Sequence, residues 1–164
     1  MEWCKWVPDK CNIHAWRLET ERIPTGEALR KRNVFLGDLT CPVCFSADES
    51  AEHLFNACFV AANVWNGVSS WCKISNFFAF SIKDLLDSHK VIPIPEKKKE
   101  VIHGIVIIVC WCLWRARNNW VLSRTPIRID KIINEVKSLG YFWYSNRSKS
   151  KGIECRERCS FDFM

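Results

Sequence analysis

Residues 41–58 read CPVCFSADESAEHLFNAC and gather four side chains that can ligate a metal ion. Cys41 and Cys44 are separated by two residues, and His53 and Cys58 follow after a gap. Tetrahedral Zn²⁺ takes thiolate and imidazole ligands, and a two-residue gap lets one tight turn present both sulfurs to the same ion. The spacing predicts one structural zinc per chain, held by these four residues with no open position for water or substrate.

A second interpretation of the same residues is that they are structural without a metal. Cysteine is among the most buried residue types, and the chain has ten of them. Cys44 and Cys58 would then be small core residues, with His53 at the surface. On an ideal helix His53 and Cys58 would lie about 140° apart. We therefore expect the chain to bend between them, or a helix to end there, if both bind one ion.

Composition and termini narrow the class of protein. The chain has 164 residues, of which 48% are hydrophobic and 26% charged, enough for one domain or for a small module with a helical extension. Ten cysteines would suit a secreted disulfide scaffold. The N-terminus, MEWCKWVPDK, lacks the basic start and apolar run of a secretory signal. We expect an intracellular protein of the nucleus or cytoplasm, where clustered cysteines more often indicate metal.

The most apolar stretch is VIHGIVIIVCWCLW, residues 101–114. As a helix it would extend about 21 Å, short of the roughly 30 Å of a bilayer core, so it predicts burial inside the fold and no membrane span. Its β-branched residues also suit a central strand, and periodicity leaves helix and strand both open.

The remaining patterns favour a mostly α protein: a small zinc-knuckle-containing helical module followed by a helical C-terminal extension. Thr25 is a candidate helix cap, and a helix after Cys58 is expected to stop near Gly67. Residues 129–143 carry apolar side chains at helical spacing, typical of a packing helix. The expected division is 1–75 for the zinc-binding module, 76–100 for a linker with prolines and lysines, 101–146 for the helical extension and 147–164 for a mobile tail.

The runs VPDKCNIHAWRLETERIPTGEALRKRNV, CPVC and ESAEHLFNACFVAANVW follow one another within about residues 3–65, somewhat over a third of the chain. In this order they resemble the zinc-binding domain at the C-terminus of reverse transcriptases of plant LINE-type retrotransposons. The segment CLWRARNNWVL, residues 112–122, is similar to a Trp-Arg-x-Arg-Asn segment downstream in such proteins. His14 departs from the family's aromatic or aliphatic residue, which suggests a partly exposed position. The residues that carry the resemblance are Val7, Pro8, Lys10, Ala15, Trp16, Arg17, Pro24, Thr25, Arg32, Cys41, Pro42, Cys44, Glu49, Ser50, His53, Leu54, Phe55, Cys58 and Trp65.

The resemblance implies an accessory role beside a polymerase, where such a domain is thought to help hold the template. A reverse transcriptase also needs paired carboxylates for its two metal ions, and this sequence has no Asp-Asp. The other cysteines and histidines have no spacing that specifies a nucleophile and its base. We interpret the chain as a fragment or stand-alone descendant of such an element, without catalytic activity of its own.

Two functions remain open. Residues 61–164 carry 17 Lys and Arg against 9 Asp and Glu, which favours binding of RNA or single-stranded DNA, with Trp71 or Trp120 as stacking surfaces. The alternative is a protein-interaction or structural remnant whose partner is a reverse transcriptase domain or another protein. The candidate nucleic-acid contacts are Arg30, Lys31, Arg32, Lys97, Lys98, Lys99, Arg115 and Arg117, with Arg147, Lys149 and Lys151 as further basic residues.

Overall fold

A computed structural model describes residues 1–34, 37–76 and 79–148 of the chain. Within these ranges the protein is helical and contains no strand beyond an isolated bridge between Thr40 and Asp48. The fold class predicted from the sequence is therefore confirmed. The elements are α1 (Asp9–Glu19), α2 (Gly26–Lys31), the π-helix η1 (His53–Ala57), α3 (Phe59–Trp71), α4 (Ile82–Val91), α5 (Glu96–Ser123) and α6 (Ile129–Arg147).

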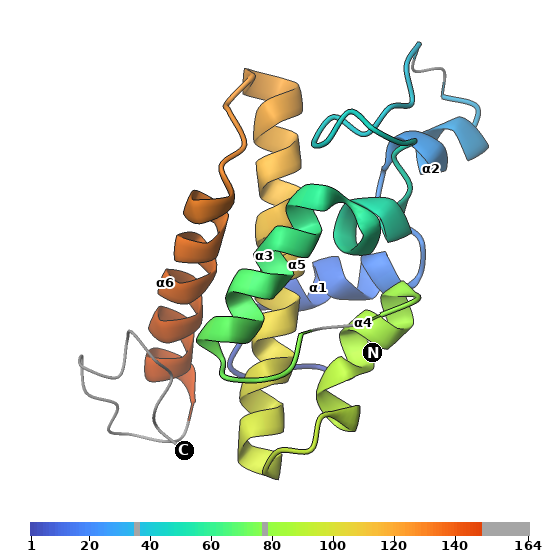
Figure 1. The fold of residues 1–164 in the computed structure, drawn as a ribbon. Coiled ribbons are helices and arrows are strands. Elements are labelled where there is room, and N and C mark those ends of the chain that lie inside the picture. The colour runs from blue at the N-terminus through green and yellow to red at the C-terminus, as the bar shows by residue number, and fades with distance from the viewer. Residues whose placement is uncertain (35–36, 77–78, 149–164) are drawn as a thin grey trace.

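Helix α5 forms the centre of the molecule. It contacts α1, α3, α4, α6 and η1, and Figure 1 shows it running through the middle of the fold. Every residue from 101 to 110 is buried, so the apolar stretch is a helix covered by protein on all sides. Residues 101–114 are therefore helix and not strand, and their expected burial inside the fold is confirmed. In the described part of the chain, no helix has the length and apolarity needed to cross a membrane.

The N-terminal segment is packed against α5 by a tryptophan and bonded to α1 by an asparagine. A Cβ built on Gly104 of α5 would lie 2.1 Å from the Trp6 ring, so only glycine allows the indole to pack this closely. Asn12 is fully buried: its amide accepts from the Cys4 N–H at 2.9 Å and donates to the carbonyls of Cys4 and Val7 at 3.0 Å. Because Asn12 belongs to α1, these contacts link α1, the N-terminal segment and α5.

Two helix ends test the sequence analysis directly. The Thr25 side chain accepts a hydrogen bond from the Ala28 N–H at 3.4 Å and caps α2 as predicted. The predicted stop at Gly67 is wrong, because α3 continues to Trp71. A Cβ on Gly67 would lie 2.4 Å from Ile133 of α6, so this glycine permits close packing of two helices and does not end one.

The range 76–100, expected as a linker, contains helix α4 and the first turn of α5. Leu85 and Leu86 of α4 are buried in the common core, and α4 contacts α1, α5 and η1. These packed leucines make α4 part of the helical body. The division into domains stays a prediction. Of the expected tail, Arg147 ends α6 and residues 149–164 lie outside the described residues.

Candidate metal centre

The four predicted ligands come together in the structure. The sulfurs of Cys41, Cys44 and Cys58 and a ring nitrogen of His53 all lie within 4.8 Å of one another. In a tetrahedral site, two sulfurs bound to one zinc at about 2.3 Å lie about 3.8 Å apart, so the observed spacing fits one ion with little movement. In the part of the chain that the structure describes, this is the one group of its kind.

A short loop presents the first two ligands, and we call residues 39–49 the knuckle. Its two ends are paired, since the Glu49 N–H donates to the Leu39 carbonyl and the Cys41 N–H to the Ala47 carbonyl, both at 2.7 Å. The turn closes when the Phe45 N–H donates to the Cys41 carbonyl at 2.9 Å. Phe45 adopts a left-handed φ of 56°, which points the chain back after Cys44.

The other two ligands lie at the ends of a single irregular turn. His53 begins the π-helix η1, and Cys58 follows its last residue with extended dihedral angles of −64° and 135°. The helix therefore ends between the two ligands, as their angular separation required. The Trp65 indole N–H donates to the Phe55 carbonyl at 2.8 Å and anchors this turn to α3.

The cluster's chemistry suits a soft divalent cation. A hydrogen bond between the sulfurs of Cys41 and Cys58 raises the pKa of Cys41 and lowers the pKa of Cys58, and burial adds to the rise at Cys41. The Cys44 sulfur lies 3.1 Å from the His53 Nε2. A cation held by these four residues would replace the proton shared by the sulfurs of Cys41 and Cys58. Three sulfurs and one imidazole fit zinc, which they would hold as a closed structural site.

The remaining described cysteines are of a different kind. Burial raises the pKa of Cys4, Cys11, Cys72 and Cys110 to about 12, so their thiols stay protonated at neutral pH. A buried neutral thiol is a poor nucleophile and a poor metal ligand. Their environment therefore agrees with core packing. Cys155 and Cys159 lie outside the described residues.

His14 is buried, contrary to the partly exposed position expected for it. Its ring contacts Phe55, Trp111 and Trp114 at centroid distances between 5.6 and 6.0 Å. Neither ring nitrogen has a hydrogen-bond partner among the described residues, and burial lowers the pKa of His14 to about 4. The neutral imidazole therefore fills the place of an aromatic core residue.

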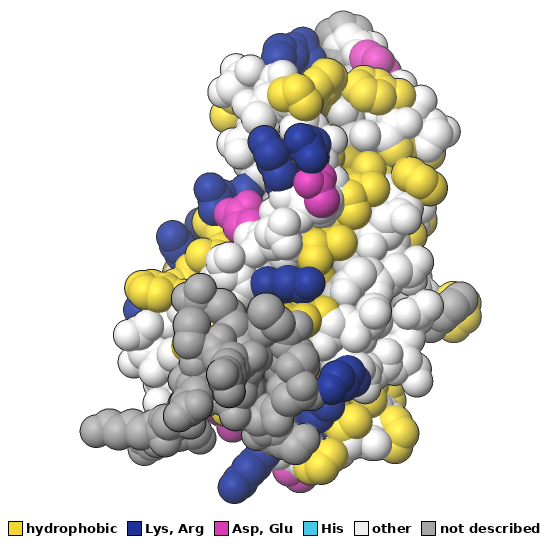
Figure 2. Space-filling view, turned by 60° about the vertical axis from the view of Figure 1, so that its left-hand side comes forward, with side chains coloured by type: hydrophobic (Ala, Val, Ile, Leu, Met, Phe, Trp, Pro, Cys, Tyr) yellow, Lys and Arg dark blue, Asp and Glu magenta, His cyan; other side chains and the backbone are white. Residues whose placement is uncertain are grey.

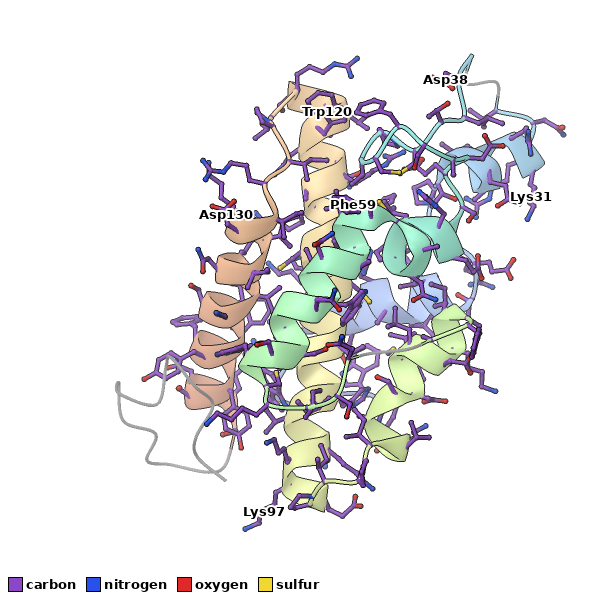
Figure 3. The ribbon with its side chains drawn as sticks, viewed as in Figure 1. Lys31, Asp38, Phe59, Lys97, Trp120 and Asp130 are labelled. Atoms are coloured by element: carbon purple, nitrogen blue, oxygen red, sulfur yellow. The ribbon has the colours of Figure 1, made fainter. Side chains whose placement is uncertain are left out.

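The predicted nucleic-acid contacts do not form one surface. Lys97 lies at the opposite end of the molecule from Lys31 and Trp120 (Figure 3). Four of the eight are ion-paired within the chain: Lys31 with Glu27, Lys99 with Glu96, Arg115 with Glu135 and Arg117 with Glu49. Arg30, Arg32, Lys97 and Lys98 form no ion pair among the described residues. Trp71, the other predicted stacking surface, is buried.

Two residues that the sequence analysis did not single out lie beside the predicted Trp120. The exposed Phe45 ring of the knuckle meets the Trp120 ring edge-on at 5.9 Å, and Arg124 lies over Trp120 at 5.8 Å. Phe45 is 63% exposed. An aromatic residue directly after Cys44, at a position where the knuckle must turn, was the available signal. Its pairing with a tryptophan 75 residues later was not readable from the sequence.

A helical protein with a metal cluster of three cysteines and one histidine is the class that the fold and the site define. Residues 1–65 match the family model described as zinc-binding in reverse transcriptase, which confirms the resemblance to that domain. The N-terminal part of the chain is thus a reverse-transcriptase-associated zinc-binding domain with a metal site consistent with zinc. The match ends within α3 and includes no catalytic domain. The searches of curated proteins and of solved structures gave no match.

Proposed function

We propose that this protein is a zinc-stabilised accessory module, derived from a plant LINE-type element, that binds single-stranded RNA or DNA and has no catalytic activity. Zinc would be held by Cys41, Cys44, His53 and Cys58. It would act structurally, by fixing the knuckle on the helical body. The chain's own residues would make the contacts with nucleic acid.

The observation that carries the nucleic-acid proposal is the aromatic and basic group at the knuckle end of the molecule. The rings of Phe45 and Trp120 offer faces for unpaired bases, and Arg124 adds a positive charge beside them. Helix α2 lies next to the knuckle, because the Glu27 N–H donates to the Glu49 carbonyl at 3.0 Å. It brings to the same end the exposed Arg30 and Arg32, which form no ion pair with any residue that the structure describes.

The charge distribution favours weak binding with little sequence preference. Figure 2 shows Lys and Arg side chains spread along one face of the molecule, with hydrophobic side chains between them, and not gathered in a single patch. A few phosphate contacts supply affinity that any strand can satisfy, and stacking tolerates every base. We therefore expect single strands to be preferred over duplex.

The test is a titration of the zinc-loaded protein with labelled single-stranded RNA, single-stranded DNA and duplex DNA at several salt concentrations. The log-log salt slope on single strands should be about −0.7 for each phosphate contact. Trp120→Ala should lower the affinity about tenfold, since one stacked base contributes roughly 1–3 kcal/mol. Arg124→Gln should flatten the slope.

Replacing Lys97, Lys98 and Lys99 together by alanine is the matched comparison, because they share the first turn of α5 and Lys97 lies at the other end of the molecule (Figure 3). If this triple variant and not Arg124→Gln flattens the slope, the footprint is at the start of α5. Binding that ignores salt, or no binding at low salt, would contradict the nucleic-acid proposal. Zinc content should be equal in all variants.

A protein partner is the second candidate, supported by large hydrophobic side chains in the solvent. Phe59, Phe80 and Leu122 are 70%, 89% and 83% exposed. Exposed groups of this size indicate contact surfaces when they lie together. A reverse transcriptase domain is the partner that the family relation favours. Salt-insensitive association with such a domain, in the absence of nucleic acid, is the result that would favour this candidate.

A further inference from the structure

Arg117 of α5 makes a buried bidentate ion pair with Glu49 of the knuckle. Its Nε donates to the Glu49 Oε1 at 2.6 Å, and its Nη2 donates to the Glu49 Oε2 at 2.7 Å. The Glu49 side chain is 3% exposed and the Arg117 side chain 13%. Such a pair is strongly favourable only while both partners stay in place, because either charge left alone in the interior is costly.

The same carboxylate also holds the start of α2. The Gly26 N–H donates to the Glu49 Oε2 at 2.8 Å, and a Cβ on Gly26 would lie 3.4 Å from that oxygen. The Glu49 backbone N–H, in turn, closes the knuckle on Leu39. Glu49 therefore connects α2, the base of the Cys41–Cys44 loop and Arg117 through one side chain and its own backbone.

Arg117 reaches the other pair of ligands by a different path. Its guanidinium lies over the Trp114 ring at 5.0 Å, and Trp114 stacks on Phe55 with centroids 6.4 Å apart. Phe55 lies inside η1, the turn that begins at His53 and is followed by Cys58. One arginine thus contacts the knuckle that presents Cys41 and Cys44 and, through Trp114, the turn that presents His53 and Cys58.

From this arrangement we propose that Arg117 is a positioning residue for the zinc site: it sets the two halves of the ligand set against each other. The C-terminal half of α5, which lies outside the matched residues 1–65, then completes the metal-binding module. The effect is reciprocal, so zinc binding strengthens the docking of this part of α5. The inference rests on the zinc part of the proposed function and is independent of nucleic-acid binding.

The first test compares the zinc affinities of three variants with that of the wild type by chelator competition. Arg117→Met should lower the affinity about ten- to a hundredfold, the range seen when residues that orient metal ligands are removed. Arg117→Lys keeps the charge without the two parallel hydrogen bonds. Its zinc affinity should lie between those of the wild type and Arg117→Met. Arg128→Met is the control, since Arg128 pairs with Asp130 at the surface. It should bind zinc as the wild type does.

A spectroscopic readout separates positioning from a general loss of stability. Each variant is loaded with Co²⁺, whose visible absorption reports the tetrahedral ligand geometry, and its helicity is measured by circular dichroism. Arg117→Met with native helicity and an altered cobalt spectrum supports the proposal. Native helicity together with wild-type zinc affinity and an unchanged spectrum would overturn it.

The third measurement needs no variant and covers the case in which Arg117→Met does not fold. Hydrogen exchange of the wild-type chain is compared with and without zinc. Residues 26–31 and 114–123 should exchange faster when zinc is removed, and residues 101–110 should not change. Equal protection of residues 114–123 with and without zinc would overturn the proposed coupling between zinc binding and α5, but not the zinc site itself. A wild-type chain that binds no zinc would overturn both the coupling and the proposed zinc site.

Discussion

The knuckle and helix α5 differ in what holds them in place. In α5, Ile105, Val106, Ile107 and Ile108 have no exposed surface, and apolar burial stabilises the helix from all sides. In the knuckle, residues 45–48 are all exposed. Its order depends on backbone pairing, the ligand cluster and the ion pair of Glu49 with Arg117.

A small loop with no core of its own can therefore be ordered by a few polar interactions. Metal-ligand bonds supply folding free energy that a loop of this size cannot obtain from hydrophobic burial. Such interactions are conditional, because each needs every partner present. The helical body should therefore survive changes that open the knuckle, whereas core changes should weaken the whole chain.

The largest effect should follow loss of the metal site. The purified protein should contain one zinc per chain, and Cys44→Ser or Cys58→Ser should abolish its retention because three ligands remain of four. Most of the helicity should persist, since α5 and α6 are packed by apolar side chains. Elemental analysis and circular dichroism are the measurements. Full zinc retention by both variants would contradict the predicted ligand set.

For the core we expect the opposite result, a loss of stability with zinc binding kept. Ile108→Ala should lower the free energy of unfolding by about 4 kcal/mol, because it leaves a cavity in a fully buried position. Zinc affinity should change little, since Ile108 lies more than two turns before Arg117 along α5. Urea denaturation and chelator competition on the same sample measure both quantities. A parallel loss of zinc affinity would mean that the two regions are not separable.

Acid should act through His14, whose ring lies between Trp111 and Trp114 of α5 and Phe55 of η1. Its folded-state pKa of about 4 lies below its ordinary value of 6.5 because burial disfavours the charged imidazole. The contribution of neutral His14 to stability is therefore fully present above pH 6.5 and is lost as the pH falls to about 4. At about pH 4 the loss in the free energy of unfolding amounts to roughly 3 kcal/mol.

His14→Phe should remove this acid sensitivity, because phenylalanine fits an aromatic environment and cannot be protonated. The difference in unfolding free energy between variant and wild type should grow from pH 7 to pH 4, as measured by denaturant titration at each pH. Other titrating groups contribute equally to both proteins. Parallel curves of unfolding free energy against pH for the two proteins would show that protonation of His14 does not destabilise the folded state.

The smallest effect concerns the cap of α2. Thr25→Ala removes the side-chain oxygen that accepts from Ala28 and should cost about 1 kcal/mol. The loss should appear as faster hydrogen exchange in residues 26–31 beside the knuckle, and little in α5. Thr25→Ser is the control, since serine keeps the accepting oxygen. Equal exchange rates in the alanine and serine variants would show that the side-chain oxygen at residue 25 does not stabilise α2.

The sequence determined the features whose chemistry is local. Cysteine and histidine spacing indicated the cluster, because ligands close in the chain are necessarily close in space. Thr25 indicated its helix, and the apolar spacing of residues 129–143 indicated α6, since caps and helical periodicity act within a few residues. The resemblance over the N-terminal third supplied the class of domain.

Only the tertiary structure decided the features that depend on distant partners. Nothing local distinguishes Arg117 from Arg115, yet one is buried against Glu49 and the other pairs with Glu135 at the surface. In the sequence Gly67 indicates a helix stop, and only its contact with Ile133 of α6 shows that it permits close packing of two helices. Whether His14 is exposed, and which ring meets Phe45, depends on how α5 crosses the other elements. That crossing is set by burial of apolar surface, which specifies no partner from sequence spacing alone.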